Sequence, residues 1–245
     1  MNKNTYLRNK ILFRDKLSTN KKYFLGIDNK NPFNIFYFNK IYDKHTKIIS
    51  NTSNKSLRFI ISYYNENLDW LRNYNNVLIY NKGNNEILGF DNIKINNVGR
   101  DVHTKFYHIY NNYENLDDYL VFLQAFPYDH SPNLNTNVNK LIDKINKGNI
   151  IKFEFISELI IDGCLFYHDT YEYMNECYKK IFGHDIKNGI NKDMMFGSGC
   201  QFIVSKENVL KHDKEFYYKI IKMLDYENAP LELYELDRFL GRIFS

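Results

Sequence analysis

The sequence predicts an α/β protein whose central sheet is mostly parallel and flanked by helices, with a more helical C-terminal part. Two observations indicate this class. Between residues 57 and 123, short apolar runs alternate with short amphipathic stretches, which is the order of βαβ units. These runs are continuously apolar, as expected for parallel strands that are covered on both faces.

Two strands and a short helix open the predicted sheet. The run LRFIISYYN at 57–65 predicts the first buried strand. Residues 66–72 predict a short helix that turns Leu68 and Leu71 inward. VLIY at 77–80 predicts the second strand, which ends in an Asn-Lys-Gly turn.

A turn, a helix and another strand follow. The turn is Asn97-Val98-Gly99, and residues 103–110 predict a helix with Phe106 and Ile109 on its inner side. The apolar run at 119–123 predicts the next strand. The loop after it is polar and contains Asp129 and His130.

The remainder of the chain predicts four helices and one strand. The helices are expected at 138–147, from a cap at Asp169 or Thr170 to Phe182, after a cap at Asp213, and at 231–243. Gly148 and Gly183 follow two of them, where a left-handed glycine commonly ends a helix. GSGCQFIVS at 197–205 predicts a glycine-rich loop that enters a strand.

Composition places limits on the class of protein. A hydrophobic fraction of 44% argues against disorder, and residues 56–245 are long enough for one α/β domain after an N-terminal extension, 1–55, of unclear role. The 33 basic and 29 acidic residues are interspersed, which gives no nucleic-acid footprint. An anionic small molecule fits this charge balance, and so does no special partner. The abundant Asn is typical of an AT-rich genome.

The cellular compartment of the protein can be predicted from its cysteines and from its hydropathy. The three cysteines form no Cys-x-x-Cys pair, which favours a reducing compartment. The sequence shows neither a signal-peptide pattern nor an apolar stretch long enough to span a membrane. We therefore expect a cytoplasmic protein. The sequence is compatible with a homo-oligomer.

Five pieces of the sequence carry a resemblance to known proteins. In order they are SYYNENLDWL, NVGRDVHTKFYHI, YLVFLQAFPYDH, GSGCQFIVS and YELDRFLGRIF, scattered over about residues 57–244. This order resembles the nucleotide-binding half of GT-A glycosyltransferases and, more closely, the domain-of-unknown-function 3431 family, which looks glycosyltransferase-like. The resemblance implies a GT-A-like, Rossmann-type sheet, with residues 57–130 as the nucleotide-binding half and 131–245 as the acceptor half.

The resemblance also implies an activity, the transfer of a sugar from a nucleotide-diphosphate donor to a glycan or glycoprotein acceptor. In such α/β folds the ligand gathers beyond the carboxyl ends of the strands. The residues expected at the nucleotide sugar are Tyr64, Asn65, Glu66, Asn97, Gly99, Arg100, Asp101, His103, Gln124 and Arg238.

Several of these residues have a structural alternative. Asn65 and Glu66 would line the base and ribose, but both types also cap helices. Gly99 permits a tight turn beside a ligand, and Arg100 can hold a diphosphate with two parallel hydrogen bonds. Asp101 would accept from a ribose hydroxyl, cap the helix or pair with Arg100. The second histidine of this helix, His108, is predicted to be a core residue.

Asp129 and His130 are the predicted metal ligands. Mn²⁺ or Mg²⁺ would bridge them to the diphosphate, and the mixed ligands suit Mn²⁺ better than Ca²⁺. The alternative is plain turn chemistry in the sequence PYDHSP. Where the family usually has an acidic residue after the Gln of FLQ, this chain has Ala125-Phe126, which weakens the metal assignment.

Glu235 and Asp237 are the predicted catalytic carboxylates. Two residues apart on a helix, they face different directions, so only one can reach the cleft. The resemblance favours Asp237, as the general base of an inverting transfer. A solvated helix face with local ion pairs is the alternative. Gly199 and Gln201 would shape an acceptor-facing loop, or only a turn.

Two other functional classes compete with a glycosyltransferase. The missing acidic residue near Phe126 favours a catalytically degenerate GT-A-like module that binds carbohydrate or a protein partner. A phosphotransferase or nuclease that uses Asp129, His130 and His103 ranks last, because the sequence has no phosphate loop with Lys.

Overall fold

The computed structural model describes residues 47–48, 54–158, 160–162, 171–186 and 194–245. All of them belong to one compact unit, Asp43–Ser245. The predicted cap at Asp169 or Thr170 and nearly all of the predicted N-terminal extension lie outside the described residues. No helix in the described ranges is both long and apolar enough to cross a membrane.

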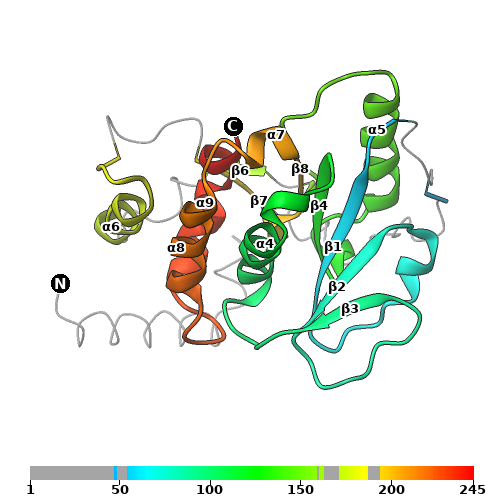
Figure 1. Cartoon of the computed structure of the whole chain (residues 1–245), viewed down its shortest axis with the longest axis horizontal. Helices are drawn as coiled ribbons and strands as arrows, with labels where there is room; N and C mark the ends of the chain where they lie inside the picture. The colour runs from blue at the N-terminus through cyan, green and yellow to red at the C-terminus, as the bar shows by residue number, and fades with distance from the viewer. Residues whose placement is uncertain (1–46, 49–53, 159, 163–170, 187–193) are drawn as a thin grey trace, which may run out of the picture. The chain divides into compact units, whose positions relative to one another are not determined.

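A six-stranded mixed sheet forms the centre of the molecule (Figure 1). Its order is β3-β2-β1-β4-β8-β5, and the first four strands of this order are mutually parallel. β8 runs antiparallel to both of its neighbours. The strands are β1 (Leu57–Tyr63), β2 (Val77–Asn81), β3 (Asp91–Lys94), β4 (Tyr119–Gln124), β5 (Phe153–Phe155) and β8 (Phe202–Ser205). The predicted α/β class is confirmed.

The parallel strands end together, at what we call the carboxyl edge. The backbone hydrogen bonds continue just past the strand ends, from Lys82 N to Tyr63 O and from Ala125 N to Ser62 O. Because β8 runs in the opposite direction, it begins at the same edge, where Phe202 pairs with Phe122. A separate two-stranded antiparallel sheet joins β6 (Ile160–Asp162) to β7 (Met195–Gly197).

Helices cover both faces of the sheet (Figure 1). One face carries α4 (Arg100–Asn111), α8 (Lys214–Leu224) and α9 (Glu232–Phe244), with α6 (Tyr171–Phe182) packed beyond them, and the other carries α5 (Leu134–Asn146). Buried side chains such as Ile60, Phe122 and Phe106 join the first face to its helices. The short α7 (Lys206–Val209) follows β8 directly.

Helix ends follow the predicted capping residues where these are described. Asp213 accepts a hydrogen bond from Phe216 N at 2.8 Å. Gly148 and Gly183 have φ values of 79° and 78°, so both predicted left-handed glycines are confirmed.

The predicted helix at 66–72 is wrong in type and start. The chain forms the 3₁₀ helix η1 (Asp69–Asn73) instead, and Leu71 is fully buried while Leu68 is half-buried. The Asn67 side chain accepts a hydrogen bond from Asp69 N at 2.7 Å. Such a bond from side chain to backbone competes with the helical backbone bonds, and it keeps Asn67 outside the helix. The described residues also form the 3₁₀ turns η2 (Tyr113–Asn115), η3 (Pro127–Asp129) and η5 (Ser198–Cys200).

Candidate functional site

Charged side chains from four separate segments lie within electrostatic reach of Asp101 at the carboxyl edge. They come from the end of β2, the start of α4, the loop that contains η3, and α9. We call this group the edge cluster, and its members are Lys82, Asp101, Lys105, Asp129 and Asp237.

Asp101 and Lys105 form the centre of the edge cluster. The Lys105 ammonium lies 2.5 Å from Asp101 Oδ2, one helical turn along α4, and only 3% of Lys105 is exposed. Burial by itself would raise the pKa of Asp101, but the Lys105 charge outweighs it and holds that pKa below its usual value. Both groups are therefore charged at neutral pH.

Asp237 of α9 contributes a second carboxylate, half-buried as a side chain. Burial raises its pKa to about 6, and the negative charge of Asp101 adds to this, while the Lys105 ammonium and the Cys200 thiol act against it. Its Oδ1 atom is buried without a hydrogen-bond partner in the described structure. The cluster thus holds a carboxylate whose pKa lies near neutrality and that has an oxygen still to be satisfied.

Asp129 contributes the third carboxylate, from η3. Burial raises its pKa, His130 and two backbone bonds oppose the rise, and the charge of Asp101 adds to it. The Oδ2 atom lies 3.5 Å from His130 Nε2. Its Oδ1 atom is buried and has no hydrogen-bond partner among the residues that the structure describes. Asp101 is therefore the common electrostatic neighbour of Asp129 and Asp237.

Lys82 closes the edge cluster at the end of β2. Its buried ammonium donates to the carbonyl of Val98 at 2.6 Å and to the carbonyl of Arg100. Burial lowers the pKa of Lys82 to about 7, although the charge of Asp101 acts in the opposite direction. Lys82 thus connects the β2 loop to the turn before α4.

Neither lysine of the edge cluster was predicted as a site residue. In the sequence, Lys82 belongs to an Asn-Lys-Gly turn, and Lys105 occupies a helix position that a lysine usually exposes to solvent. The one available signal for Lys105 is its spacing of four residues from Asp101, which allows an ion pair on a helix.

The predicted phosphate-binding turn is held by the loop between α8 and α9. Gly99 N donates to Glu227 O at 2.9 Å and Arg100 N donates to Asn228 O at 3.0 Å, so these two amides already have partners. The carbonyl of Asn97 accepts from Asn228 Nδ2 at 3.4 Å. The side chain of Arg100 is exposed, whereas the next residue, Asp101, turns into the edge cluster.

His103 is buried behind this turn. Its pKa is lowered to about 4, first by burial and then by the Lys82 charge, so the imidazole is neutral. Its Nδ1 atom has no hydrogen-bond partner within the described residues, and Nε2 lies 4.0 Å from Asp225. His103 therefore packs against the cluster as an uncharged group.

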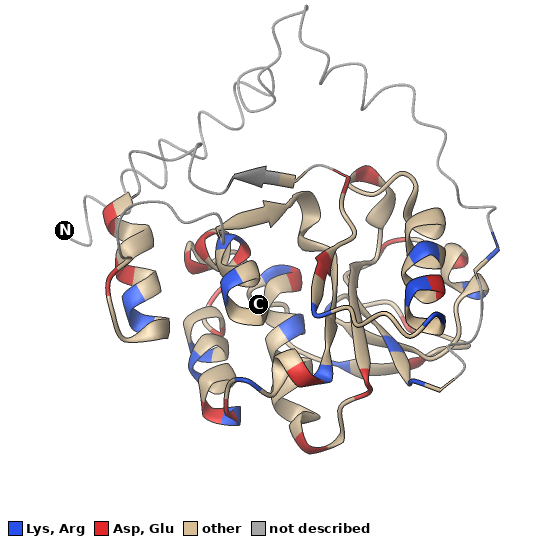
Figure 2. Ribbon diagram, turned by 90° about the horizontal axis from the view of Figure 1, so that it is seen from above, with Lys and Arg blue, Asp and Glu red and all other residues tan. Residues whose placement is uncertain are grey.

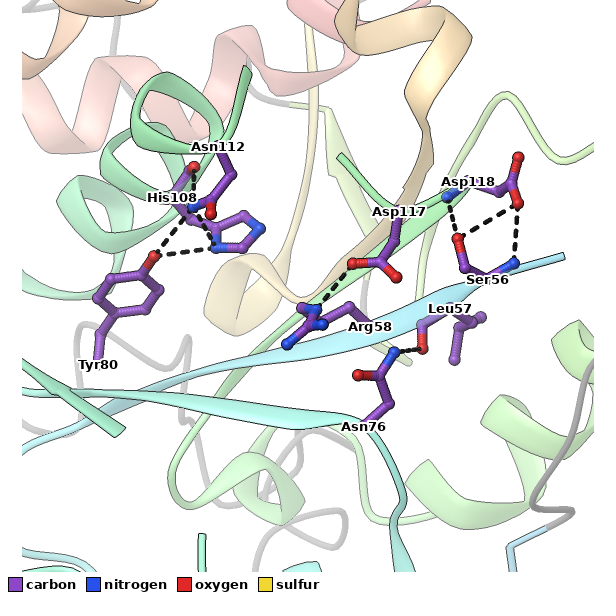
Figure 3. Close-up of polar contacts among 9 residues, drawn as sticks. All are labelled: Ser56, Leu57, Arg58, Asn76, Tyr80, His108, Asn112, Asp117 and Asp118. Atoms are coloured by element: carbon purple, nitrogen blue, oxygen red, sulfur yellow. Dashed lines mark hydrogen bonds and ion pairs between the residues drawn. The ribbon is translucent and has the colours of Figure 1, made fainter. Parts of the chain in front are cut away.

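His108 is the core residue that was predicted. Its Nδ1 atom lies 3.0 Å from the Tyr80 hydroxyl. Asn112 is bonded to both of these groups, as Figure 3 shows. The Arg58–Asp117 ion pair, at 2.7 Å, appears in the same view. The first contacts join β2 to α4, the ion pair joins β1 to the residues before β4, and none of them involves the cluster residues.

The turn after β1 is closed by hydrogen bonds among its own residues, Tyr64, Asn65 and Glu66. Glu66 Oε2 accepts from Tyr64 N at 2.7 Å and from Asn65 N at 3.0 Å. Asn65 Oδ1 accepts from Asn84 N at 3.2 Å, which links the first two loops of the edge. The side chains of this turn are exposed.

A surface cavity lies beside Glu66. Its volume is about 570 Å³, and its walls come from η1 and from residues 86–90 of the β2–β3 loop, with Tyr63 beneath. Volumes of roughly 300–1,000 Å³ are usual for small-molecule sites. The cavity adjoins the predicted base-binding turn and is not lined by members of the edge cluster.

The loop before β8 braces the loop that contains η3. Gln201 is fully buried, and its Nε2 atom donates to Pro127 O at 2.9 Å. Gly199 has a φ of 74° and lies against the His130 ring. Gln124 ends β4 beside Ser62, half-buried, so it lies at the carboxyl edge as predicted.

Glu235 and Arg238 form an ion pair on α9, within electrostatic reach of Asp237. Both are buried, with Arg238 Nη1 3.3 Å from Glu235 Oε2 and 2.6 Å from Tyr234 O. Burial raises the pKa of Glu235 to about 7, although Arg238 opposes this. The Glu235 charge acts on Cys177 of α6, whereas Asp237 lies beside Cys200. Each carboxylate thus has its own cysteine neighbour, although the charge of Asp237 also raises the pKa of Glu235.

The Asp129–His130 pair fits a hard divalent cation that is shared with a substrate. The buried, unsatisfied Asp129 Oδ1 and the adjacent His130 Nε2 offer two ligands, and Mg²⁺-type sites commonly add substrate phosphates to one or two protein groups. In the described ranges no group of three or more His, Cys, Asp or Glu side chains is arranged to hold a metal.

Charges elsewhere are mixed. Figure 2 shows Lys and Arg interspersed with Asp and Glu along the described helices and strands.

The fold and the edge cluster define a class, an α/β protein with a mostly parallel six-stranded sheet and buried charged groups at its carboxyl edge. The chain belongs to the family described as "Protein of unknown function (DUF3431)", which matches residues 59–245. The predicted family membership is confirmed. No curated protein and no solved structure matches the chain.

Proposed function

We propose that this protein is a GT-A-like glycosyltransferase that moves a sugar from a nucleotide-diphosphate donor to a glycan or protein acceptor. One observation carries the proposal. Three carboxylates from α4, η3 and α9 converge at the carboxyl edge, which is where α/β sheets bind their ligands. Two of the three have a buried oxygen without a hydrogen-bond partner in the described structure, and a catalytic role or a bound ion is one explanation of such an oxygen.

The donor would lie along the edge from the cavity beside Glu66 to Asp129. The cavity is large enough for a nucleoside, and Glu66 offers an acceptor for base or ribose donors. The buried lysines supply positive charge close to the path of the diphosphate. Asp129 and His130 would hold Mn²⁺ or Mg²⁺, which when bound neutralises charge on the leaving nucleotide.

Asp237 would accept the proton of the acceptor hydroxyl. A pKa near 6 leaves most of this carboxylate deprotonated at neutral pH while it remains basic enough to take a proton in the transition state. Glu235, paired with Arg238, would hold α9 in place. These assignments make Asp237 the catalytic carboxylate and Glu235 a structural one.

Calorimetry with uridine, guanosine and thymidine diphosphates, with and without Mn²⁺, tests the proposal. We expect binding of one nucleotide that strengthens with Mn²⁺, and loss of the Mn²⁺ effect in Asp129→Ala. Asp143→Ala is the matched control, because this exposed aspartate on α5 lies outside the edge cluster. The absence of heat with all three nucleotides in the presence of Mn²⁺ would contradict the proposal.

A binding module with the same fold is the second candidate. It is favoured by the lack of a three-ligand metal group in the described ranges and by the occupied amides of Gly99 and Arg100. A module without chemistry would bind a nucleotide sugar or a glycan but never release free sugar. Hydrolysis of the nucleotide sugar by the wild-type protein, lost in Asp237→Asn, would decide for the enzyme.

A further inference from the structure

The loop before β8 meets the predicted metal ligand His130 directly. The Ser198 hydroxyl lies 2.8 Å from His130 Nδ1, within normal hydrogen-bond distance. The two residues are 68 positions apart in sequence, so the contact joins η5 to the loop after β4. This contact with Ser198 helps to orient the His130 ring.

The glycine beside Ser198 fits the same ring. A Cβ atom at Gly199 would lie 2.5 Å from His130 Cδ2 and 2.7 Å from Cγ, closer than real side chains allow. The φ of 74° at Gly199 is also a conformation that other residues rarely adopt. The ring is thus held by a hydrogen bond on one side and by the bare backbone of Gly199 on another.

The backbone of the same loop is fixed independently. His130 O accepts from Glu158 N at 3.2 Å, and the fully buried Gln201 donates to Pro127 O. These bonds hold the position of His130, but they leave its ring orientation to Ser198 and Gly199.

We propose that Ser198 is a positioning residue that holds His130 with Nδ1 protonated, so that Nε2 faces a divalent cation shared with Asp129. This inference rests on the proposed function and names a residue that the function did not require. A histidine that binds a metal through one nitrogen usually bonds a partner through the other, and that partner sets which nitrogen carries the proton. The separation of 3.5 Å between Nε2 and Asp129 Oδ2 is too long for a good N–H···O bond, as expected for two groups that act as ligands.

Mn²⁺ binding measured by electron paramagnetic resonance tests this inference in the full chain. Ser198→Ala should weaken Mn²⁺ binding by about 10- to 100-fold, the usual effect of removing such a partner. Ser157→Ala is the matched control, because Ser157 is a nearby buried serine whose hydroxyl has no hydrogen-bond partner among the described residues. It should leave the affinity unchanged. Equal affinity in wild type and Ser198→Ala would overturn the inference, and so would absence of Mn²⁺ binding in wild type.

A second readout does not depend on the metal. Nitrogen-15 NMR of the histidine rings should show His130 protonated at Nδ1 in the wild-type protein and shifted toward Nε2 protonation in Ser198→Ala. Nε2 protonation in the wild type would overturn the inference. If both readouts behave as expected but no nucleotide diphosphate binds, the cation site stands and the proposed transferase activity fails.

Discussion

Lys105 lies 2.5 Å from Asp101 at the carboxyl edge. The charges of this ion pair shift the pKa values of the other members of the edge cluster. Its ammonium acts on Asp237 as well, and the Asp101 carboxylate acts on Asp129. Removing either partner leaves an uncompensated buried charge, which costs far more than removing both.

Breaking this pair should destabilise the protein strongly. Lys105→Met should lower the free energy of unfolding by about 3–5 kcal/mol, the usual cost of stranding one partner of a buried pair. The double variant Asp101→Asn, Lys105→Met should recover most of that loss. Urea unfolding of the single and double variants measures both values. Equal destabilisation in the single and double variants would show that the charges are not coupled as the geometry indicates.

Lys82 should make stability depend on pH above neutrality. Its pKa is near 7 in the folded protein and about 10.5 when the chain is unfolded, so between these values the unfolded chain binds the extra proton. The free energy of unfolding therefore rises with pH between these two values. The reason is that the cost of burying a charged ammonium disappears as Lys82 loses its proton. We expect the difference in unfolding free energy between wild type and Lys82→Met to shift in favour of wild type from pH 7 to pH 9.

Lys94→Met provides the control for this pH profile. Lys94 is also bonded to a backbone carbonyl, that of Gly83, but its side chain belongs to an exposed edge strand. Its replacement removes a lysine that is not a member of the edge cluster, so comparison of the two pH profiles isolates the contribution of Lys82. A Lys82→Met profile that matches the Lys94→Met profile would mean that Lys82 is protonated normally in the folded protein.

Gly99 should tolerate no side chain. An alanine Cβ would lie 2.7 Å from His103 Cβ and 2.9 Å from Leu224 Cβ, in addition to the cost of a φ of 56°. Gly89→Ala separates the two effects, because Gly89 has a φ of 82° and nothing within 4 Å of the added atom. We expect about 1–2 kcal/mol for Gly89→Ala, from backbone strain alone, and clearly more for Gly99→Ala, by urea unfolding. Similar losses at both positions would contradict the packing at Gly99.

The buried strands of the sheet could be predicted because their burial is visible in the sequence. β1, β2 and β4 are covered on both faces, which produces continuous apolar runs. β3 and β5 could not be predicted in this way. The four residues of β3 are all exposed, and β5 has only three residues, so neither strand shows a pattern of apolar residues that could be recognised in the sequence. The antiparallel direction of β8 depends on its pairing with β4, which local sequence does not encode.

The acidic half of the edge cluster could be predicted and the basic half could not. Asp101, Asp129 and Asp237 stand in motifs that resemble a known family, and the structure brings them near one another. Lys82 and Lys105 have no such motif, and lysines are almost always exposed. Their burial results from the packing of α4 against β2 and α9, a relationship between segments that no single stretch of sequence contains.

If Asp237 is the general base, the rate of sugar transfer should fall as pH drops below its pKa of about 6. Asp101→Asn should move this acid limb to lower pH, because the negative charge of Asp101 raises the pKa of Asp237 and because the unpaired Lys105 then lowers it further. Asp225→Asn, which alters a half-exposed carboxylate beside His103, should leave the limb in place. The profile of kcat against pH for the three proteins measures this. An acid limb that does not move in Asp101→Asn would mean that another group accepts the proton, since any carboxylate in electrostatic contact with Asp101 must respond to the loss of its charge.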